Sequence, residues 1–224
     1  MKHINHDDLL HMPSRYRAQV INSLSGFKSA NLIGTHNEQH INNLAIFSSV
    51  FHLGASPALV GFITRPDSVE RHTLENIKQT KHYTINQVGE SFWQSAHQTS
   101  ANYPAAECEF IKTGLTPYKV EGINAPFVKE SQLKYALTLQ EIIPIQLNGT
   151  LLVIGKITDI ICDEKAIKND GYIDIESLNT VSISGLDSYH TSQRLTRVSY
   201  AKPEEELVEI PLNGLLQNSL LSQK

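Results

Sequence analysis

The 224-residue sequence has only two cysteines, Cys108 and Cys162, which lie far apart and outside any C-x-x-C spacing. They could pair with each other, but the sequence favours two buried free thiols in a reducing cytosol. A chain of this length needs no disulfide or metal to support its fold, because about 70% of its unfolded surface can be buried. The scarcity of cysteine therefore argues against a small disulfide-rich secreted domain.

Long hydrophobic runs are also missing. The longest apolar stretches, such as residues 151–154, have the length of a β-strand and fall far short of the roughly 20 residues that cross a bilayer. The first residues, 1–8, lack the apolar core of a secretory signal peptide. We therefore expect a cytoplasmic protein without a membrane partner.

An excess of positive charge is absent as well. The chain has 19 Lys and Arg against 23 Asp and Glu, a net charge of −4, which argues against nucleic acid as a partner. The motifs G-x-G-x-x-G, G-x-x-x-x-G-K-[ST] and G-x-S-x-G do not occur. The sequence thus gives no support to a dinucleotide-binding fold, a P-loop or an α/β-hydrolase.

The candidates for a metal or carboxylate centre are weak. His36 and His40 are four residues apart, but a turn predicted between them argues against a shared metal ion. Glu107 and Glu109 alternate like neighbours on a strand and could form a carboxylate pair, although a solvent-facing pair is the favoured interpretation because nothing else converges on them. We expect no metal site.

Most of the remaining pattern is β. Apolar and alternating segments predict strands at residues 30–35, 41–53, 58–64 and 83–88. A long hairpin is predicted from the arms 135–147 and 150–161, joined by Asn148-Gly149 as a favoured two-residue turn. Helical spacing appears at 73–81, with Thr73 as the expected N-cap, and at 91–100. Many strands with few helices favour a closed β-barrel with helices on its outside.

Two segments place polar groups where a ligand could use them. Along residues 42–49, amides and hydroxyls interrupt an apolar extended run, and a buried polar group without a partner costs about 1–3 kcal/mol. Arg65 precedes a helix start at 72–77, whose free N–H groups and positive dipole end suit a phosphate. Each feature has a plainer explanation: Ser48 and Ser49 could bond only to neighbouring strands, and Thr73 could only cap its helix.

Together these segments resemble the flavin reductase-like family of FMN-binding split barrels, which includes the flavoredoxins. The similar segments follow in order over roughly residues 30–189: 43–49, 57–62, Arg65, 72–77, Phe110 with 114–116, 125–131 and 152–157. The resemblance implies a mainly β fold with flanking helices, a six-stranded Greek-key split β-barrel. It also implies non-covalently bound FMN and a homodimer with the flavin near the interface.

The resemblance further implies where the cofactor lies. Residues 43–49 would border the isoalloxazine and ribityl chain, and Ser48 or Ser49 with Arg65, Thr73 and Asn76 would hold the phosphate. The implied cofactor-binding residues are Asn43, Leu44, Ala45, Phe47, Ser48, Ser49, Arg65, His72, Thr73 and Asn76. No catalytic side chain is implied, because the flavin itself takes the hydride. The chain departs from the commoner pattern at Ile46, where proline is frequent, and at His52 and His72, where other polar residues are common.

Three functions fit these expectations. The leading one is an NAD(P)H-dependent flavin or FMN reductase that passes a hydride to bound FMN, with a monooxygenase or an electron acceptor as partner. The others are a flavoprotein that reduces a distinct substrate, and an FMN-carrying electron-transfer or flavin-storage protein without nicotinamide turnover. We expect an N-terminal extension at 1–25, the barrel domain at 26–190 and a C-terminal extension at 191–224 packed on the barrel. Groups in 189–203 could cover the flavin or a nicotinamide, or simply pack.

Overall fold

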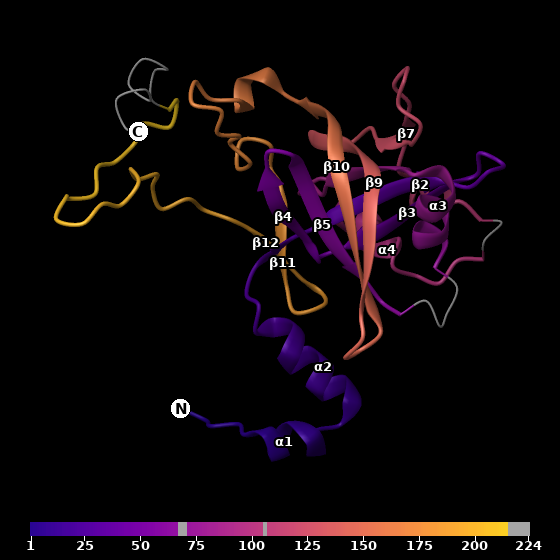
Figure 1. Cartoon of the computed structure of the whole chain (residues 1–224), viewed down its shortest axis with the longest axis horizontal. Helices are drawn as coiled ribbons and strands as arrows, with labels where there is room; N and C mark the ends of the chain where they lie inside the picture. The colour runs from indigo at the N-terminus through magenta and orange to yellow at the C-terminus, as the bar shows by residue number, and fades with distance from the viewer. Residues whose placement is uncertain (67–70, 105–106, 215–224) are drawn as a thin grey trace.

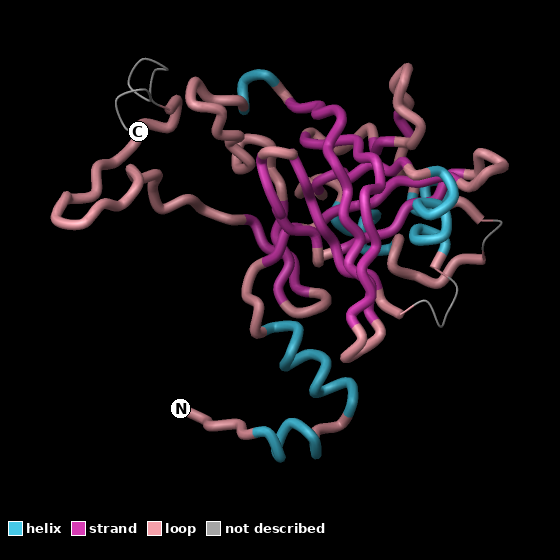
Figure 2. Tube along the Cα trace, viewed as in Figure 1, coloured by secondary structure: helices cyan, strands magenta, loops and turns pink. Residues whose placement is uncertain are grey.

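The computed structural model describes residues 1–66, 71–104 and 107–214, in which most strands belong to one antiparallel sheet of seven (Figures 1 and 2). Its strands, in the order in which they pair, are β3 (Asn42–Phe47), β2 (Asn31–His36), β6 (His82–Gln87), β9 (Leu133–Ile145), β10 (Thr150–Cys162), β5 (Ala58–Thr64) and β4 (Val50–Ala55). Two smaller sheets are β1 (Lys28–Ser29) with β11 (Val181–Ser184) and β12 (Ser188–Thr191), and β7 (Pro117–Tyr118) with β8 (Phe127–Val128). The helices are α1 (His6–His11), α2 (Ser14–Ser23), α3 (His72–Thr80), α4 (Trp93–Gln98), α5 (Glu109–Thr113) and the 3₁₀ turn η1 (Glu164–Ala166).

The large sheet closes on itself because its two edge strands are consecutive in the chain. β3 and β4 lie at opposite ends of the strand order, yet only Ser48 and Ser49 separate them. A flat sheet of seven strands would hold its edges about 29 Å apart, whereas the three Cα steps from Phe47 to Val50 span at most about 11 Å. β3 and β4 are therefore two halves of one bent strand, and the sheet is the expected barrel of six strands.

Two hydrophobic clusters stabilise the barrel. The first fills its interior, and α3 contributes Leu74 and Ile77 to it; its other members are Ile33, Val60, Phe62, Tyr83, Ile85, Leu137, Leu151 and Val153. The second lies on the other face of β2 and β3, under α4, α5 and the β1–β11–β12 sheet, where Leu44 meets Phe110 and Ile183. Neighbouring residues of β3 thus point into different clusters, as the alternation of a strand requires.

The strand predictions are confirmed, and three local predictions are wrong. The loop between β9 and β10 has four residues, 146–149, because Thr150 pairs with Ile145. Thr73 is not the N-cap of α3, which begins one residue earlier at His72 and has Arg71 in the cap position. Glu109 is not on a solvent-facing strand but is the buried first residue of α5.

The chain beyond β12 is held against the loop at 170–176. The Arg194 side chain forms ion pairs with Asp174 and with Glu176. Arg197 donates to the Asp170 carboxylate at 2.6 Å and lies over the Tyr172 ring, 4.1 Å from its centroid. Beyond this anchor the chain turns back through a bridge between residues 198 and 209 and extends away from the barrel (Figure 1).

Within the described ranges, no helix combines the length and the apolar character that crossing a membrane requires.

A close approach inside the barrel requires glycine at position 155. A Cβ added there would overlap the Tyr83 hydroxyl and lie 3.0 Å from Leu137 Cδ2. Tyr83 is completely buried, and its hydroxyl makes no hydrogen bond to any described residue. The tyrosine ring therefore depends on the missing side chain of Gly155 for its position.

We predict that Gly155→Ala lowers the free energy of unfolding by about 1–3 kcal/mol, because the added methyl overpacks the core. In a Tyr83→Phe background the same change should cost less, since the overlapping hydroxyl is gone; a double-mutant cycle by urea denaturation measures this coupling. Gly54→Ala in β4 is the control, because a Cβ there meets only the Pro57 carbonyl oxygen at 3.4 Å. An additive cycle would contradict the proposed clash.

Candidate functional site

Buried amides connect β3 and β2 to helix α3. The Asn43 side chain of β3 donates from Nδ2 to Thr73 Oγ1 at 3.0 Å. One turn along the helix, Asn76 Nδ2 donates to Thr35 Oγ1 of β2, also at 3.0 Å. All four residues are buried, and buried pairs of this kind fix geometry because breaking either leaves polar atoms unsatisfied. The beginning of α3 is therefore fixed beside the bent strand.

A second buried contact fixes the open edge of β3. β3 pairs with β2 on one side only, and the backbone N–H of Leu44 donates to Glu109 Oε2 at 3.0 Å. Burial is the main cause that raises the pKa of Glu109, while the Leu44 N–H and the nearby His72 act in the opposite direction. This role could not be predicted from the residues around Glu109, because its partner Leu44 lies 65 positions earlier in the chain.

The bend between β3 and β4 uses one of its two serines for the fold. Ser49 Oγ donates to the Ile63 carbonyl oxygen at 2.8 Å and accepts from the Ile63 N–H at 3.3 Å, which is the plainer role considered for it. Continuing this register places Ser48 beside Thr64 and next to Arg65. Ser48 is half-buried and makes no side-chain hydrogen bond to a described residue, and Arg65 is exposed. Of the polar side chains predicted at this bend, Ser48 and Arg65 therefore remain available to a ligand.

The N-terminus of α3 has the properties of an anion site. The helix has nine residues, and its cap residue Arg71 supplies no side-chain hydrogen bond to the first turn. The first N–H groups of a helix have no partner within the helix, and its dipole favours negative charge there. His72 and Thr73 begin this helix, and Thr73 is 7% exposed, so its hydroxyl is within the protein rather than in solvent.

Three further residues of the predicted cofactor site, Phe47, Leu44 and Ala45, are apolar. Phe47 packs its ring against Phe62 of β5, with centroids 5.2 Å apart, and belongs to the interior cluster. Leu44 is fully buried under α5, so it can offer a ligand backbone atoms only. Ala45 is half-buried and pairs with Ile33 of β2.

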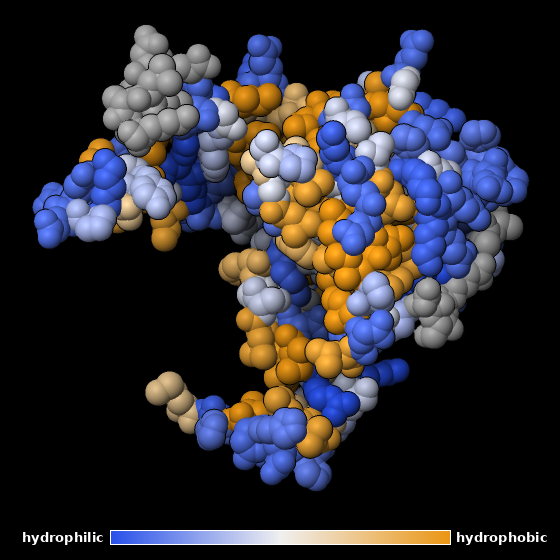
Figure 3. Space-filling model, viewed as in Figure 1, coloured by the Kyte–Doolittle hydropathy of each residue, from blue (hydrophilic) through white to orange (hydrophobic). Residues whose placement is uncertain are grey.

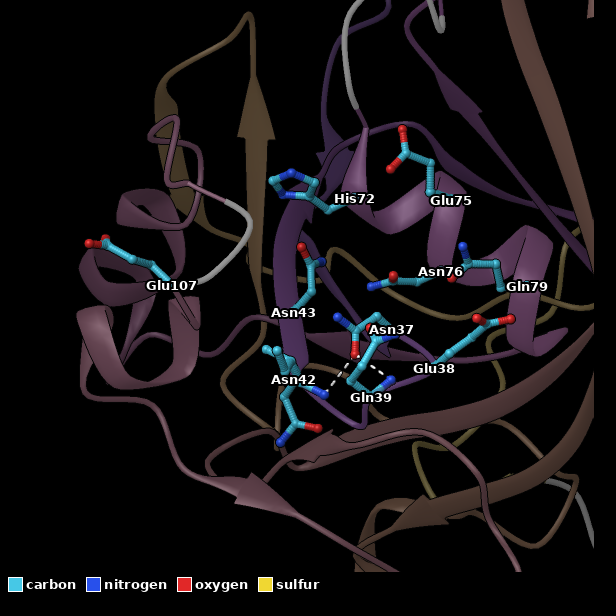
Figure 4. A pocket seen from close by; sticks show the side chains of 11 residues that line it. Asn37, Glu38, Gln39, Asn42, Asn43, His72, Glu75, Asn76, Gln79 and Glu107 are labelled. Atoms are coloured by element: carbon cyan, nitrogen blue, oxygen red, sulfur yellow. Dashed lines mark hydrogen bonds between the residues drawn. The ribbon is translucent and has the colours of Figure 1, made fainter.

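A polar cavity of about 200 Å³ opens between β3, α3 and the turn at 37–41 (Figure 4). Asn43, His72 and Asn76 are the predicted site residues that line it; the other lining residues are Asn37, Glu38, Gln39, Ile41, Asn42, Glu75, Gln79 and Glu107. Ligand pockets usually measure about 300–1,000 Å³, and three carboxylates here would repel a phosphate. The cavity therefore borders the candidate site and is not the phosphate position itself.

The chemistry of these groups fits a flavin mononucleotide. An uncapped helix start, the Arg65 guanidinium and the Ser48 hydroxyl are donors suited to a phosphate. The bent strand offers backbone groups and the small Ala45 side chain, so a planar ring can approach closely. The Asn43–Thr73 bond joins the two halves of this arrangement.

Comparison with known proteins assigns the chain to a family. The sequence model of the flavin reductase like domain matches residues 25–176, more than half of the chain. The chain belongs to this family, and it is a flavin reductase-like oxidoreductase of the split-barrel fold.

Solved structures agree with that assignment. A split-barrel protein of Shewanella frigidimarina NCIMB 400, assigned as a flavin reductase, is 52% identical, covers 90% of this chain and 100% of its own, and superposes with a TM-score of 0.87. Nitrilotriacetate monooxygenase component B of Bacillus cereus (21% identical; 87% and 96% covered) has a TM-score of 0.76. Flavoredoxin of Desulfovibrio vulgaris (22%; 80% and 92%) has a TM-score of 0.65. At these lower identities the likeness shows the fold alone.

We predict a pH-dependent contribution from Glu109. Its raised pKa means that the folded protein holds the proton more tightly than the unfolded chain. The contribution of Glu109 to the free energy of unfolding is therefore largest at acid pH, and it declines as the pH rises through the pKa of Glu109 in the folded protein. Relative to Glu109→Gln, which keeps the acceptor but cannot ionise, the wild type should lose unfolding free energy above its ordinary pKa of 4.5.

Urea denaturation of both proteins between about pH 4 and pH 8 measures this difference. Glu107→Gln is the control, because Glu107 forms only a half-exposed ion pair with Lys112. Glu109→Ala, which leaves the Leu44 N–H without its acceptor, should be less stable than Glu109→Gln by about 1–3 kcal/mol at any pH in that range. A stability difference that does not vary with pH would contradict the assigned titration.

Proposed function

We propose that the protein is an NAD(P)H-dependent flavin reductase that binds FMN between the bent strand β3–β4 and the start of α3. The observation that carries this proposal is the uncapped N-terminus of α3, which the buried Asn43–Thr73 hydrogen bond joins to the bent strand. Family membership supports flavin chemistry. FMN and the nicotinamide donor are our proposal from the resemblance and from the chemistry of the donors.

Each part of the site has a distinct task in this proposal. Arg65, Ser48 and the first N–H groups of α3 bind the phosphate, with the Thr73 hydroxyl beside them. The backbone of 43–49 orients the ring, and Glu109 holds that backbone in place by accepting from the Leu44 N–H. Bound FMN supplies the redox chemistry by accepting a hydride from the nicotinamide. The protein's own contribution is therefore positioning and electrostatics, without a nucleophile.

We also propose that the reductase acts as a homodimer and delivers reducing equivalents to a separate acceptor. The resemblance to the flavin reductase-like family suggests a two-component arrangement, in which the acceptor is a monooxygenase or another electron acceptor. Reduced flavin that leaves the site would then be the carrier between the two proteins.

Anaerobic mixing of the FMN-loaded protein with NADH or NADPH tests the reductase proposal. We expect the oxidised flavin absorbance near 450 nm to bleach with at least one donor, because hydride transfer removes that band. The control is free FMN with the same donor. Tight FMN binding without bleaching by either donor would reject the reductase and leave an electron carrier or flavin store.

The phosphate position has its own test. Arg65→Ala and Thr73→Val should each weaken FMN binding by about 1–3 kcal/mol, because each removes a hydrogen-bonding group from a charged ligand. Fluorescence titration of FMN measures the affinity, and riboflavin, which lacks the phosphate, should bind the Arg65→Ala variant as it binds the wild type. Thr80→Val, at the other end of α3, is the matched control. Unchanged FMN affinity in both variants would place the phosphate elsewhere.

A further inference from the structure

Residues 4–27, which we call the N-terminal arm, expose an unusual amount of apolar surface. Neither α1 nor α2 buries a single residue. Tyr16 and Val20 of α2 and Leu24, the C-cap residue that follows the helix, recur every four residues and so lie along one face. Tyr16 is 56% and Leu24 74% exposed. Leu10 of α1 is 59% exposed. Apolar side chains gathered on one exposed face mark a site of interaction with another surface.

The arm is nevertheless held in a defined position. Asn5 and Asp8 cap α1 reciprocally, and Arg17 of α2 donates to the carbonyl oxygens at the end of α1. At its base, Lys28 Nζ donates to the Asn22 and Gly185 carbonyl oxygens at 2.9 and 2.8 Å, which ties α2 to the turn between β11 and β12. From this base the arm extends away from the barrel rather than folding over it (Figures 1 and 2).

The barrel carries a second uncovered apolar surface, which we call the outer face of β4, β5, β9 and β10. Phe51 and Leu53 of β4 and Leu152 of β10 all lie over Gly61, since a Cβ added there would be 3.0–3.1 Å from each of them. Ile63, Leu152 and Ile143 form a row across β5, β10 and β9. Phe51, Leu53 and Ile143 are 38–41% exposed. The barrel helices pack on β2 and β3 instead, and the apolar surface is visible in Figure 3.

The exposed area has the size that association requires. A compact monomer of this mass should expose about 10,200 Å², whereas this chain exposes 14197 Å². Residues outside the described ranges could supply at most about 160 Å² each. More than about 1,000 Å² of the excess therefore belongs to described residues, in the N-terminal arm, the outer face and the extended residues beyond β12. Stable homodimers bury about 2,000–5,000 Å² in total over both chains.

We propose that the N-terminal arm of each chain packs its apolar face on the outer face of β4, β5, β9 and β10 of a second copy. Because each chain carries both surfaces, a twofold dimer makes the same contact twice: each arm covers the outer face of the other chain. The arm is fixed at its base and directed outward, which suits a neighbour better than its own barrel. This deepens the homodimer of the proposed function by naming its surfaces, and it rests on that part of the proposal only.

Sedimentation velocity on the full chain tests the association. The wild type should sediment as a dimer, twice the chain mass of 25.0 kDa. Leu10→Glu with Leu24→Glu should weaken the dimer by at least about tenfold, because a carboxylate would be buried in an apolar contact. Ile111→Glu on α5, where the native side chain is 81% exposed, is the matched control and should stay dimeric. A monomeric wild type, or a double variant that dimerises normally, would overturn the proposal.

Photocross-linking identifies the surface. Tyr16→p-benzoylphenylalanine in a mixture of ¹⁵N-labelled and unlabelled chains should give mixed-isotope cross-links to peptides of β4–β5 or β9–β10. Cross-links within one chain, between two arms only, or to no such peptide would overturn the assignment. Flavin bleaching by NAD(P)H is measured on the same wild-type sample. A monomer whose flavin is bleached would overturn the proposed dimer surfaces and support the reductase function. A cross-linked dimer whose flavin is not bleached would support the dimer surfaces and overturn the reductase function.

Discussion

The covalent link between β3 and β4 is the constraint on which the rest of the structure depends. Two residues join strands that hydrogen-bond at opposite edges of the large sheet, so the sheet must close and the strand must bend at Ser48 and Ser49. At such a bend the ladder of one strand cannot continue smoothly into the next, and backbone and hydroxyl groups become available. The Ser49 hydroxyl bonds the bend to Ile63 of β5, which leaves the half-buried Ser48 hydroxyl available to a ligand.

The buried polar contacts along β3 are consequences of that closure. An edge strand carries N–H groups that no neighbour satisfies, and leaving one buried without a partner costs about 1–3 kcal/mol. Glu109 satisfies the Leu44 N–H, and Asn43 of the same strand bonds to Thr73 of α3. Both contacts also place a carboxylate and a helix N-terminus beside β3, the strand that leads into the bend. The groups that complete the barrel are thus the groups that form the candidate site.

The sequence predicted the barrel well because its strands carry strong local patterns. The run at 58–64 coincides with β5, and the long segment at 41–53 contains both halves of the bent strand. Local pattern could not show that the segment bends to close a barrel, since the strand order depends on pairing between distant residues. Glu109 was misjudged for the same reason: its burial arises from contacts with β3, 65 positions away in the chain.

The bent strand also connects the candidate flavin site to the surface that we propose for a second copy. β4 begins directly after Ser49, turns Val50 into the barrel interior and exposes Phe51 on the outer face. A partner chain that covers Phe51 and Leu53 would restrict the motion of β4. Because β4 continues directly from the bend, this would also restrict the motion of the backbone and of the Ser48 hydroxyl at the bend. Ordering the bend in advance reduces the conformational entropy that a bound cofactor must overcome. In such an arrangement, association would strengthen flavin binding even if the second chain contributed no side chain to the flavin.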